Sequence, residues 1–288
     1  MTVPSRGWAL ATGRVARVGG SPEVTLHWLL RVACAMCFVG HGAWGVLTKA
    51  GWLPFYGVFG IAPALAWKTM PLVGAIDIVL GLSALVWPTR AALVYMTGWA
   101  IFTALLRPAA GMGWWEFLER GGNYGPPLAF ALVAGGGAAG WFGRIEPAPL
   151  APERVRGASW VLRVSITLLL VGHGGFGLIQ EKKLLLAHWH ALGVPADTTF
   201  LHVIGAAEIL SGVALLIHPS RALLLGIAYW KLASELLYPW SGKLRDTWEW
   251  VERGGDYLAP FALLVLLALL ERQSTNSSRT TLERATGL

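Results

Sequence analysis

The apolar residues of this chain come in blocks of about 20, the length that a helix needs to cross the hydrocarbon core of a bilayer. Hydrophobic residues make up 55% of the sequence and charged residues only 14%, and the mean hydropathy is +0.55, which is outside the range of soluble domains. The 16 tryptophans are typical of a membrane interface, where indole rings settle. We therefore predict an all-α integral membrane protein whose main environment is the lipid bilayer.

Eight membrane-spanning helices are predicted from these blocks. They cover residues 28–48, 69–88, 90–107, 126–143, 160–180, 200–218, 220–238 and 257–271. The segments "WPTR" (87–90) and "HPSR" (218–221) each hold a proline that ends one helix before the next begins. Lysine and arginine are more frequent on the side of the N-terminus, which favours a protein of the cytoplasmic (inner) membrane with both termini in the cytoplasm. The formal net charge of +7 is spread over loop ends and both termini, so it predicts an orientation signal rather than a nucleic-acid surface.

The chain contains an internal repeat, in which three segments return in the same order after 131 to 133 residues. The pairs are "LLRVACAMCFVGHGAWG" (29–45) with "VLRVSITLLLVGHGGFG" (161–177), "VGAIDIVLGLSALVWPTRA" (73–91) with "IGAAEILSGVALLIHPSRA" (204–222), and "FLERGGNYGPP" (117–127) with "WVERGGDYLAP" (250–260). Each unit holds an even number of predicted helices, so both units should enter the membrane in the same orientation. The predicted fold is therefore eight transmembrane helices in two parallel-oriented four-helix repeats. The domains are a cytoplasmic N-terminal segment (1–27), repeat 1 (28–144), a cytoplasmic linker (145–159), repeat 2 (160–271) and a flexible cytoplasmic tail (272–288).

Ionisable side chains recur at one depth of the predicted membrane. A rise of about 1.5 Å per residue places His41 and Asp77 near the bilayer centre, and His173 and Glu208 occupy the matching positions of the second unit. A charged group at that depth costs roughly 2.5–3.5 kcal/mol, so these side chains should face away from lipid and pair with one another. The histidines are candidate cofactor-binding residues, since neighbouring glycines leave room for a planar ligand. The acids are candidate catalytic residues; alternatively, each pair only holds two helices together.

Lys231 lies at the same depth in the second unit, and Glu235 follows it by four residues on the same helix face. The first unit has Ala100 and Ala104 at these positions. Both charged residues are candidate catalytic residues, and their restriction to one unit predicts one working site rather than two equal ones. The alternative is that Lys231 only neutralises Glu235 or Glu208.

The repeated Glu-Arg-Gly-Gly motif supplies further candidates. Six of its residues are candidate cofactor-binding residues: Glu119, Arg120 and Tyr124 in the first copy, and Glu252, Arg253 and Tyr257 in the second. On the outer side of the membrane, the charged residues would pair locally or hold an anionic head group. We predict that Asn123 and Asp256 cap the fourth helix of each unit, that the tyrosines lie in the aromatic belt, and that the prolines occupy the first helical turn. A structural cap is the alternative to a quinone or substrate mouth lined by Trp114, Trp115, Trp248 and Trp250.

Two further patterns are interpreted as structural. Cys34 and Cys37 lie within the first predicted helix and have no counterparts in the second unit, so we expect them to pack rather than to form a redox pair. His188 and His190 are too few ligands for a metal site on their own, and none is predicted.

Each unit resembles a DoxX-type four-helix membrane protein. The resemblance depends on "GHGxxG" in a first helix, "GAxD/E-I-x-x-G" in a second, a "P-[ST]-R" turn, and a glycine-rich segment with a polar or acidic residue that opens the fourth helix. It covers residues 28–143 and 160–271, although the family's usual member is a single unit. Some DoxX-type proteins are similar to subunits of thiosulfate:quinone oxidoreductase or of terminal quinol oxidase systems.

The resemblance implies a redox-linked membrane subunit of a quinone-linked oxidoreductase, with quinone as its cofactor and a soluble or peripheral redox partner. A variant of this hypothesis has haem b bound between His41 and His173 as axial ligands. Fusion of two units would also suit a family that works as a dimer, and the chain is compatible with a homo-oligomer. The midplane charges also fit a small-solute or proton transporter, and a non-catalytic assembly or scaffold subunit is the third hypothesis.

Overall fold

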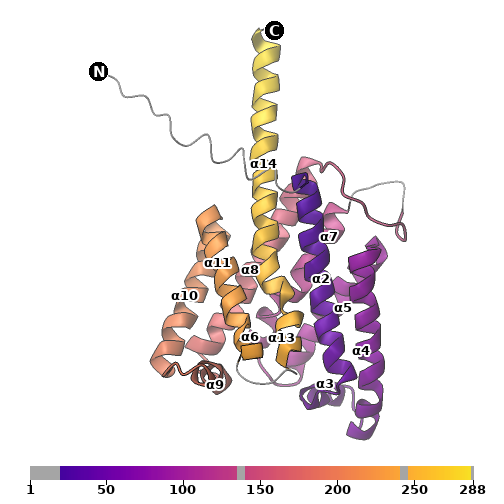
Figure 1. The fold of residues 1–288 in the computed structure, drawn as a ribbon, viewed down its shortest axis with the longest axis vertical. Coiled ribbons are helices and arrows are strands. Elements are labelled where there is room, and N and C mark those ends of the chain that lie inside the picture. The colour runs from indigo at the N-terminus through magenta and orange to yellow at the C-terminus, as the bar shows by residue number, and fades with distance from the viewer. Residues whose placement is uncertain (1–19, 135–139, 241–245, 287–288) are drawn as a thin grey trace.

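The computed structural model describes residues 20–134, 140–240 and 246–286, and every regular element among them is helical (Figure 1). In chain order the elements are α2 (Pro22–Val46), the 3-10 turn η1 (Ala50–Trp52), α3 (Leu53–Gly57), α4 (Pro63–Val86), α5 (Arg90–Ala109), α6 (Trp115–Leu118), α7 (Gly121–Val133), α8 (Pro152–Leu178), α9 (Lys183–Ala191), α10 (Thr198–Ile217), α11 (Arg221–Glu235), α12 (Leu237–Trp240), α13 (Thr247–Glu252) and α14 (Gly254–Thr286).

Six segments of the described chain are long and apolar enough to cross a membrane. They are α2, α4, α5, α8, α10 and Thr247–Asn276, which covers α13 and most of α14. A helix suits lipid because it satisfies its own backbone hydrogen bonds. By contrast, α7 has 13 residues and α11 has 15, which gives lengths of about 20 and 22 Å, less than a bilayer core of roughly 30 Å. Among the described residues, the helix of the predicted span 220–238 is therefore shorter than predicted, and that of 126–143 ends at Val133, with residues 135–139 of this span outside the described part of the chain.

Both proline-containing reversals form as predicted. α4 ends at Val86 and α5 begins at Arg90, where the Thr89 hydroxyl caps the new helix by accepting from the backbone N–H of Ala92 at 3.2 Å. Ser220 caps α11 in the same way, by accepting from the N–H of Leu223 at 3.2 Å. These caps satisfy first-turn N–H groups that would otherwise lack partners.

Glycines allow the first two long helices of each half to touch. A Cβ on Gly42 of α2 would come within 2.5 Å of the Gly74 carbonyl oxygen on α4. In the second half, a Cβ on Gly174 of α8 would lie 2.5 Å from the Gly205 carbonyl oxygen on α10. Because no side chain fits at either contact, the backbones of α2 and α4, and of α8 and α10, are held close together.

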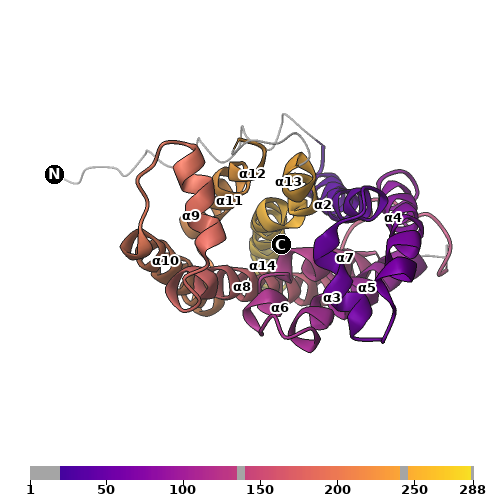
Figure 2. The same ribbon diagram turned by 90° about the horizontal axis from the view of Figure 1, so that it is seen from below.

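The helices α7 and α14 connect the two halves of the chain. α7 packs against α8, and α14 packs against α2, so each of them contacts the first long helix of the other half. Viewed along the bundle, α2, α7, α8 and α14 form its centre, with α4 and α5 on one side and α10 and α11 on the other (Figure 2). A contiguous apolar core that includes Leu30, Phe130, Leu162 and Leu263 fills this centre.

Two connecting segments are more helical than predicted. α14 continues to Thr286 and extends beyond the other helices (Figure 1), so residues 272–286 form a helix where we expected a flexible tail. Similarly, α8 begins at Pro152, within the predicted linker 145–159. The predicted N-terminal segment lies largely outside the described residues.

Candidate functional site

The predicted histidine–acid pairs both form. Nδ1 of His41 on α2 lies 2.7 Å from Oδ2 of Asp77 on α4, and Nδ1 of His173 on α8 lies 2.7 Å from Oε2 of Glu208 on α10. Both acids are buried, whereas each imidazole keeps a small exposed area. The carboxylate accepts from Nδ1–H in this arrangement, which fixes the tautomer and leaves Nε2 of each ring available for another group.

His41 lines a cavity of about 210 Å³, here called the His41 cavity. Its other walls are mostly aromatic or apolar: Trp52, Phe55, Tyr56, Phe59, Ile61, Val73, Trp99, Phe102, Thr103, Leu106 and Arg107. The His41 ring stacks on Trp52 with a centroid distance of 4.5 Å. Phe59 and Phe102 stack on each other at 6.1 Å and are both exposed, so this side of the cavity is open at the surface of the helices. An aromatic space with a few polar groups is typical of a small-molecule site.

Two buried polar atoms beside this cavity lack a hydrogen-bond partner among the described residues. They are Oδ1 of Asp77 and Nε1 of Trp99. In the second half the matching atoms are bonded, since Trp230 Nε1 donates to Glu208 Oε1 at 2.7 Å. The difference has a simple cause: aspartate is one methylene shorter than glutamate, so Asp77 reaches His41 but not the indole. An unmet buried donor and acceptor each cost about 1–3 kcal/mol, which favours a bound group between or beside them.

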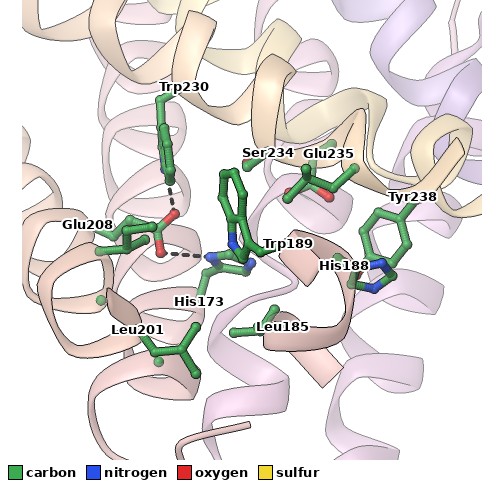
Figure 3. A pocket seen from close by; sticks show the side chains of 14 residues that line it. His173, Leu185, His188, Trp189, Leu201, Glu208, Trp230, Ser234, Glu235 and Tyr238 are labelled. Atoms are coloured by element: carbon green, nitrogen blue, oxygen red, sulfur yellow. Dashed lines mark hydrogen bonds and ion pairs between the residues drawn. The ribbon is translucent and has the colours of Figure 1, made fainter. Parts of the chain in front are cut away.

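His173 lines a smaller cavity of about 30 Å³, here called the His173 cavity (Figure 3). That volume holds about two water molecules. Figure 3 shows the Trp189 indole beside the His173 imidazole, with Glu235 and Tyr238 farther along the wall. Burial lowers the pKa of His188 on the loop helix α9, so this ring is neutral at pH 7. A wider groove of about 430 Å³ lies between α10 and α11 and is almost entirely apolar apart from Glu208, Ser211 and Trp230.

Lys231 and Glu235 form the predicted ion pair on α11, with Nζ 2.7 Å from Oε1. Lys231 is 0% exposed and Glu235 is 1% exposed. Oε2 of Glu235 also lies 3.3 Å from Nε of Arg253, which connects the pair to the centre of the molecule. At the matching positions of the first half, Ala100 lies beside His41 in a small cavity of about 20 Å³ that continues the aromatic space. The small Ala100 thus leaves open space next to His41, whereas in the second half the charged Glu235 lies in the wall of the His173 cavity.

The charged residues of the repeated motif are buried rather than placed at an outer mouth. Glu119, Arg120, Glu252 and Arg253, here called the ionic cluster, are each at most 7% exposed. They pair across the two halves: Arg120 donates to Glu252 at 2.5 Å, and Arg253 lies 2.7 Å from Glu119. Local pairing, the first of the two predicted alternatives, also occurs, since Nε of Arg120 lies 3.0 Å from Oε2 of Glu119. An outer head-group site does not fit this arrangement, because each guanidinium is neutralised by a buried carboxylate of the other motif.

Charge complementarity keeps this cluster ionised. Glu119 lies in the connection between α6 and α7, where burial alone would raise its pKa. Arg120 and Arg253 outweigh that effect and hold the pKa of Glu119 well below its ordinary value. A charged, fully paired cluster at the centre fits a structural role in holding the two halves together.

The paired glycines of the motif allow this contact. A Cβ on Gly122 would overlap Oδ1 of Asp256, and a Cβ on Gly255 would overlap the carbonyl oxygen of Gly122. The two glycine pairs thus lie against each other where α7 meets α14. The motif occurs twice because each copy supplies one side of the same contact between the halves.

Three predictions for this motif are wrong. Asn123 and Asp256 do not cap their helices, because α7 begins at Gly121 and α14 at Gly254, ahead of them. Tyr124 and Tyr257 are 7% and 4% exposed, so they are core residues and not part of an aromatic belt. The prolines lie in the second turn of each helix rather than the first. The errors for the caps and the prolines share one cause, since the helices start at the glycine pairs, whereas the tyrosines are buried by packing between helices.

The predicted tryptophan mouth does not form as one site. Trp114 is exposed, Trp115 packs at Gly175 of α8, and Trp250 stacks on Tyr257 at 5.8 Å. Trp248 packs against a separate small core that contains Trp44 and Trp52.

The haem variant does not fit the geometry. His41 and His173 line different cavities, and Nδ1 of each ring is paired with its own acid. The two rings are therefore not opposed across a shared space that an iron could occupy. Within the described residues, no group of three or more His, Cys, Asp or Glu side chains has the arrangement of a metal site. Cys34 and Cys37 are free and buried, in agreement with a packing role.

Comparisons with known proteins returned no match, whether to a protein-family model, to a curated protein or to a solved structure.

Proposed function

We propose that this protein binds a lipophilic, quinone-class carrier in the His41 cavity and exchanges protons with it through His41 and Asp77. The observation that carries the proposal is the combination of an aromatic cavity of about 210 Å³ with one oriented imidazole in its wall. A flat ring can stack between the aromatic side chains, and its oxygen can reach Nε2 of His41. Exposed Phe59 and Phe102 at the rim give an apolar carrier access from lipid.

The proton chemistry follows from the hydrogen bonds. A quinol hydroxyl donates to Nε2 of His41, because Nδ1–H is held by Asp77. A bound quinol would supply two electrons and two protons: Nε2 of His41 would accept one proton, with the Asp77 carboxylate stabilising the imidazolium that forms, and the second proton would go with the two electrons to a soluble or peripheral redox partner. Trp99 Nε1 has no partner of its own among the described residues, so it is available to donate to the second ring oxygen. The protein would thus be the membrane subunit of a quinone-linked oxidoreductase.

The proposed membrane arrangement is eight crossings in two four-helix units of one orientation, with both termini in the cytoplasm of an inner-membrane protein. The repeated histidine–acid pairs and the reciprocal packing of α7 on α8 and α14 on α2 support it. Short α7 and α11 are compatible with it because a buried ion pair lies near the outer end of each helix, Arg120 with Glu252 at α7 and Lys231 with Glu235 at α11. The DoxX-type resemblance of each unit supports the same arrangement and the link to quinones.

Equilibrium binding of a tritium-labelled short-chain benzoquinone to the detergent-purified protein tests the proposal. His41→Ala should weaken binding at least tenfold, whereas His173→Ala, the matched control from the second half, should leave it within twofold. Equal losses in both variants, or no saturable binding by the unaltered protein, would count against it.

A proton transporter is the second candidate, and the Lys231–Glu235 pair beside the His173 cavity favours it. Proton flux in liposomes without quinone, abolished by Glu208→Gln but not by Asp77→Asn, would support transport instead. Lack of both binding and flux would leave a scaffold role.

A further inference from the structure

A second, separate groove lies at the end of the bundle where α8 begins and α10 ends. It has a volume of about 90 Å³ and is formed by α8, the α10–α11 turn and α14. One side is polar and holds Arg156, Ser159, Trp160 and Arg163, and the other is apolar and holds Pro219, Leu263, Leu267 and Leu270. The groove shares no lining residue with the His41 or His173 cavities.

Two arginines, seven residues apart on α8, face this groove. Arg163 is held in place by three contacts. Its Nε donates to the carbonyl oxygen of Leu215 at 2.9 Å, and its Nη2 donates to the carbonyl oxygen of Leu216. The guanidinium carbon lies 4.6 Å from the centroid of the Trp160 ring. Arg156 is exposed and makes no hydrogen bond or ion pair with any described residue. The Arg163 guanidinium is thus fixed at the groove, whereas the Arg156 guanidinium has no ion-pair partner among the described residues.

The nearest acid on α14 does not provide that counter-charge. Glu271 pairs with Arg221 at the start of α11, and Glu153, three residues before Arg156 on α8, forms no ion pair with it. This end of the bundle therefore carries unbalanced positive charge where it lines the groove, and an anion would neutralise it.

The groove lies at the depth of a membrane interface. α8 has 27 residues, or about 40 Å of helix, so several of its residues must extend beyond a core of roughly 30 Å. Trp160 is 55% exposed and marks the boundary, where tryptophan is enriched. Leu267 and Leu270 are three residues apart on one face of α14 and are only half-buried, as contact with an acyl chain would require, and the buried Leu263 forms the floor of the groove.

The first half of the chain has no equivalent groove chemistry. Val24 occupies the position that matches Arg156. Arg31 matches Arg163 and also stacks on a tryptophan, Trp28, at 4.8 Å, but it is only 3% exposed. The paired arginines are thus a property of the second half and not of the repeat.

We propose that this groove is a specific site for an anionic phospholipid. The head-group phosphate lies between Arg156 and Arg163, and one acyl chain runs along the half-buried Leu267 and Leu270 of α14. Basic pockets between transmembrane helices bind anionic head groups in this way, whereas a free phosphate ion would gain nothing from the apolar side of the groove.

A lipid titration tests this site. Phosphatidylglycerol is added to the delipidated, detergent-solubilised protein, and native mass spectrometry measures the fraction of protein with lipid bound. We expect saturable binding of phosphatidylglycerol and no comparable binding of phosphatidylcholine. Arg156→Gln should weaken the affinity about fivefold, the effect of one arginine near a phosphate. Arg154→Gln, which removes the same charge from the same helix outside the groove, should leave it unchanged.

Arg163→Gln should weaken binding further, but it also removes the contacts with the end of α10, so Arg156→Gln is the decisive variant. Equal affinities of Arg156→Gln and Arg154→Gln would overturn the proposal, as would equal binding of both lipids. Displacement of the lipid by millimolar inorganic phosphate would show a simple anion site and would also overturn it. None of these outcomes depends on quinone binding at His41.

Discussion

The buried pair Lys231–Glu235 gives the most quantitative prediction. Both side chains are at most 1% exposed, and in the described structure the only ion pair of Lys231 is with Glu235 at 2.7 Å. Glu235→Gln removes that partner and leaves Lys231 buried without an ion pair, with Glu208 and Asp256 as the remaining acids in its surroundings. Breaking a buried pair on one side costs about 3–5 kcal/mol of unfolding free energy.

Lys231→Met should cost less, because Glu235 keeps Arg253 at 3.3 Å. The double variant removes both charges and should lie within about 2 kcal/mol of the unaltered protein, since replacing a whole buried pair is often nearly neutral. The first half, with Ala100 and Ala104 at these positions, shows that a helix can pack there without charges. We therefore expect a favourable coupling energy of about 2–4 kcal/mol between the two side chains.

The assay is a double-mutant cycle of unfolding free energies. Each protein is unfolded by replacing a mild detergent with sodium dodecyl sulfate, and far-UV circular dichroism monitors the loss of helix. If the two single effects add to within about 0.5 kcal/mol of the double effect, the residues are not coupled and the reasoning is refuted. A single Lys231→Met effect larger than that of Glu235→Gln would refute the role assigned to Arg253.

Three further results are expected. Asp77→Glu should let the longer carboxylate reach the indole N–H of Trp99, as Glu208 does in the second half, and so weaken benzoquinone binding without loss of thermal stability. Gly122→Ala should destabilise the protein by about 3 kcal/mol or more in thermal unfolding, because its Cβ has no space, whereas the matched Gly98→Ala, with open space around it, should be neutral or stabilising. The pKa of Glu119 is depressed by its arginines, so its contribution to stability is complete above the ordinary carboxyl pKa and lost as pH falls through the depressed value. The difference in unfolding free energy between the unaltered protein and Glu119→Gln should hence be constant from pH 8 to about 5 and shrink only at lower pH; a difference that begins to shrink near neutral pH would contradict this.

Much of the architecture could be predicted from the sequence, because the signals involved are local. Apolar block length predicts long helices, and proline with a hydroxyl residue predicts the two reversals. The cost of burying charge predicts that His41 pairs with Asp77, and helical spacing predicts the contact of Lys231 with Glu235.

The contacts between the halves could not be predicted in the same way. An internal repeat shows that two motifs are equivalent, but it does not show that Glu119 pairs with Arg253 of the other half as well as with Arg120 of its own. Reading the motif as an exposed cap also placed Tyr124 at the surface, although it is buried where α7 meets its neighbours. The two unequal cavities are lined by different connecting segments, Trp52–Ile61 at His41 and α9 at His173, and how far these segments enter the bundle depends on the packed structure.

Photoaffinity labelling with an azidobenzoquinone tests the central claim most directly. The account predicts that the labelled peptides contain Trp52–Phe59 or Trp99–Arg107, that labelling is competed by unlabelled quinone, and that His41→Ala abolishes it while His173→Ala does not. Competed labelling in the groove between α10 and α11 instead, or labelling that no quinone competes, would contradict it.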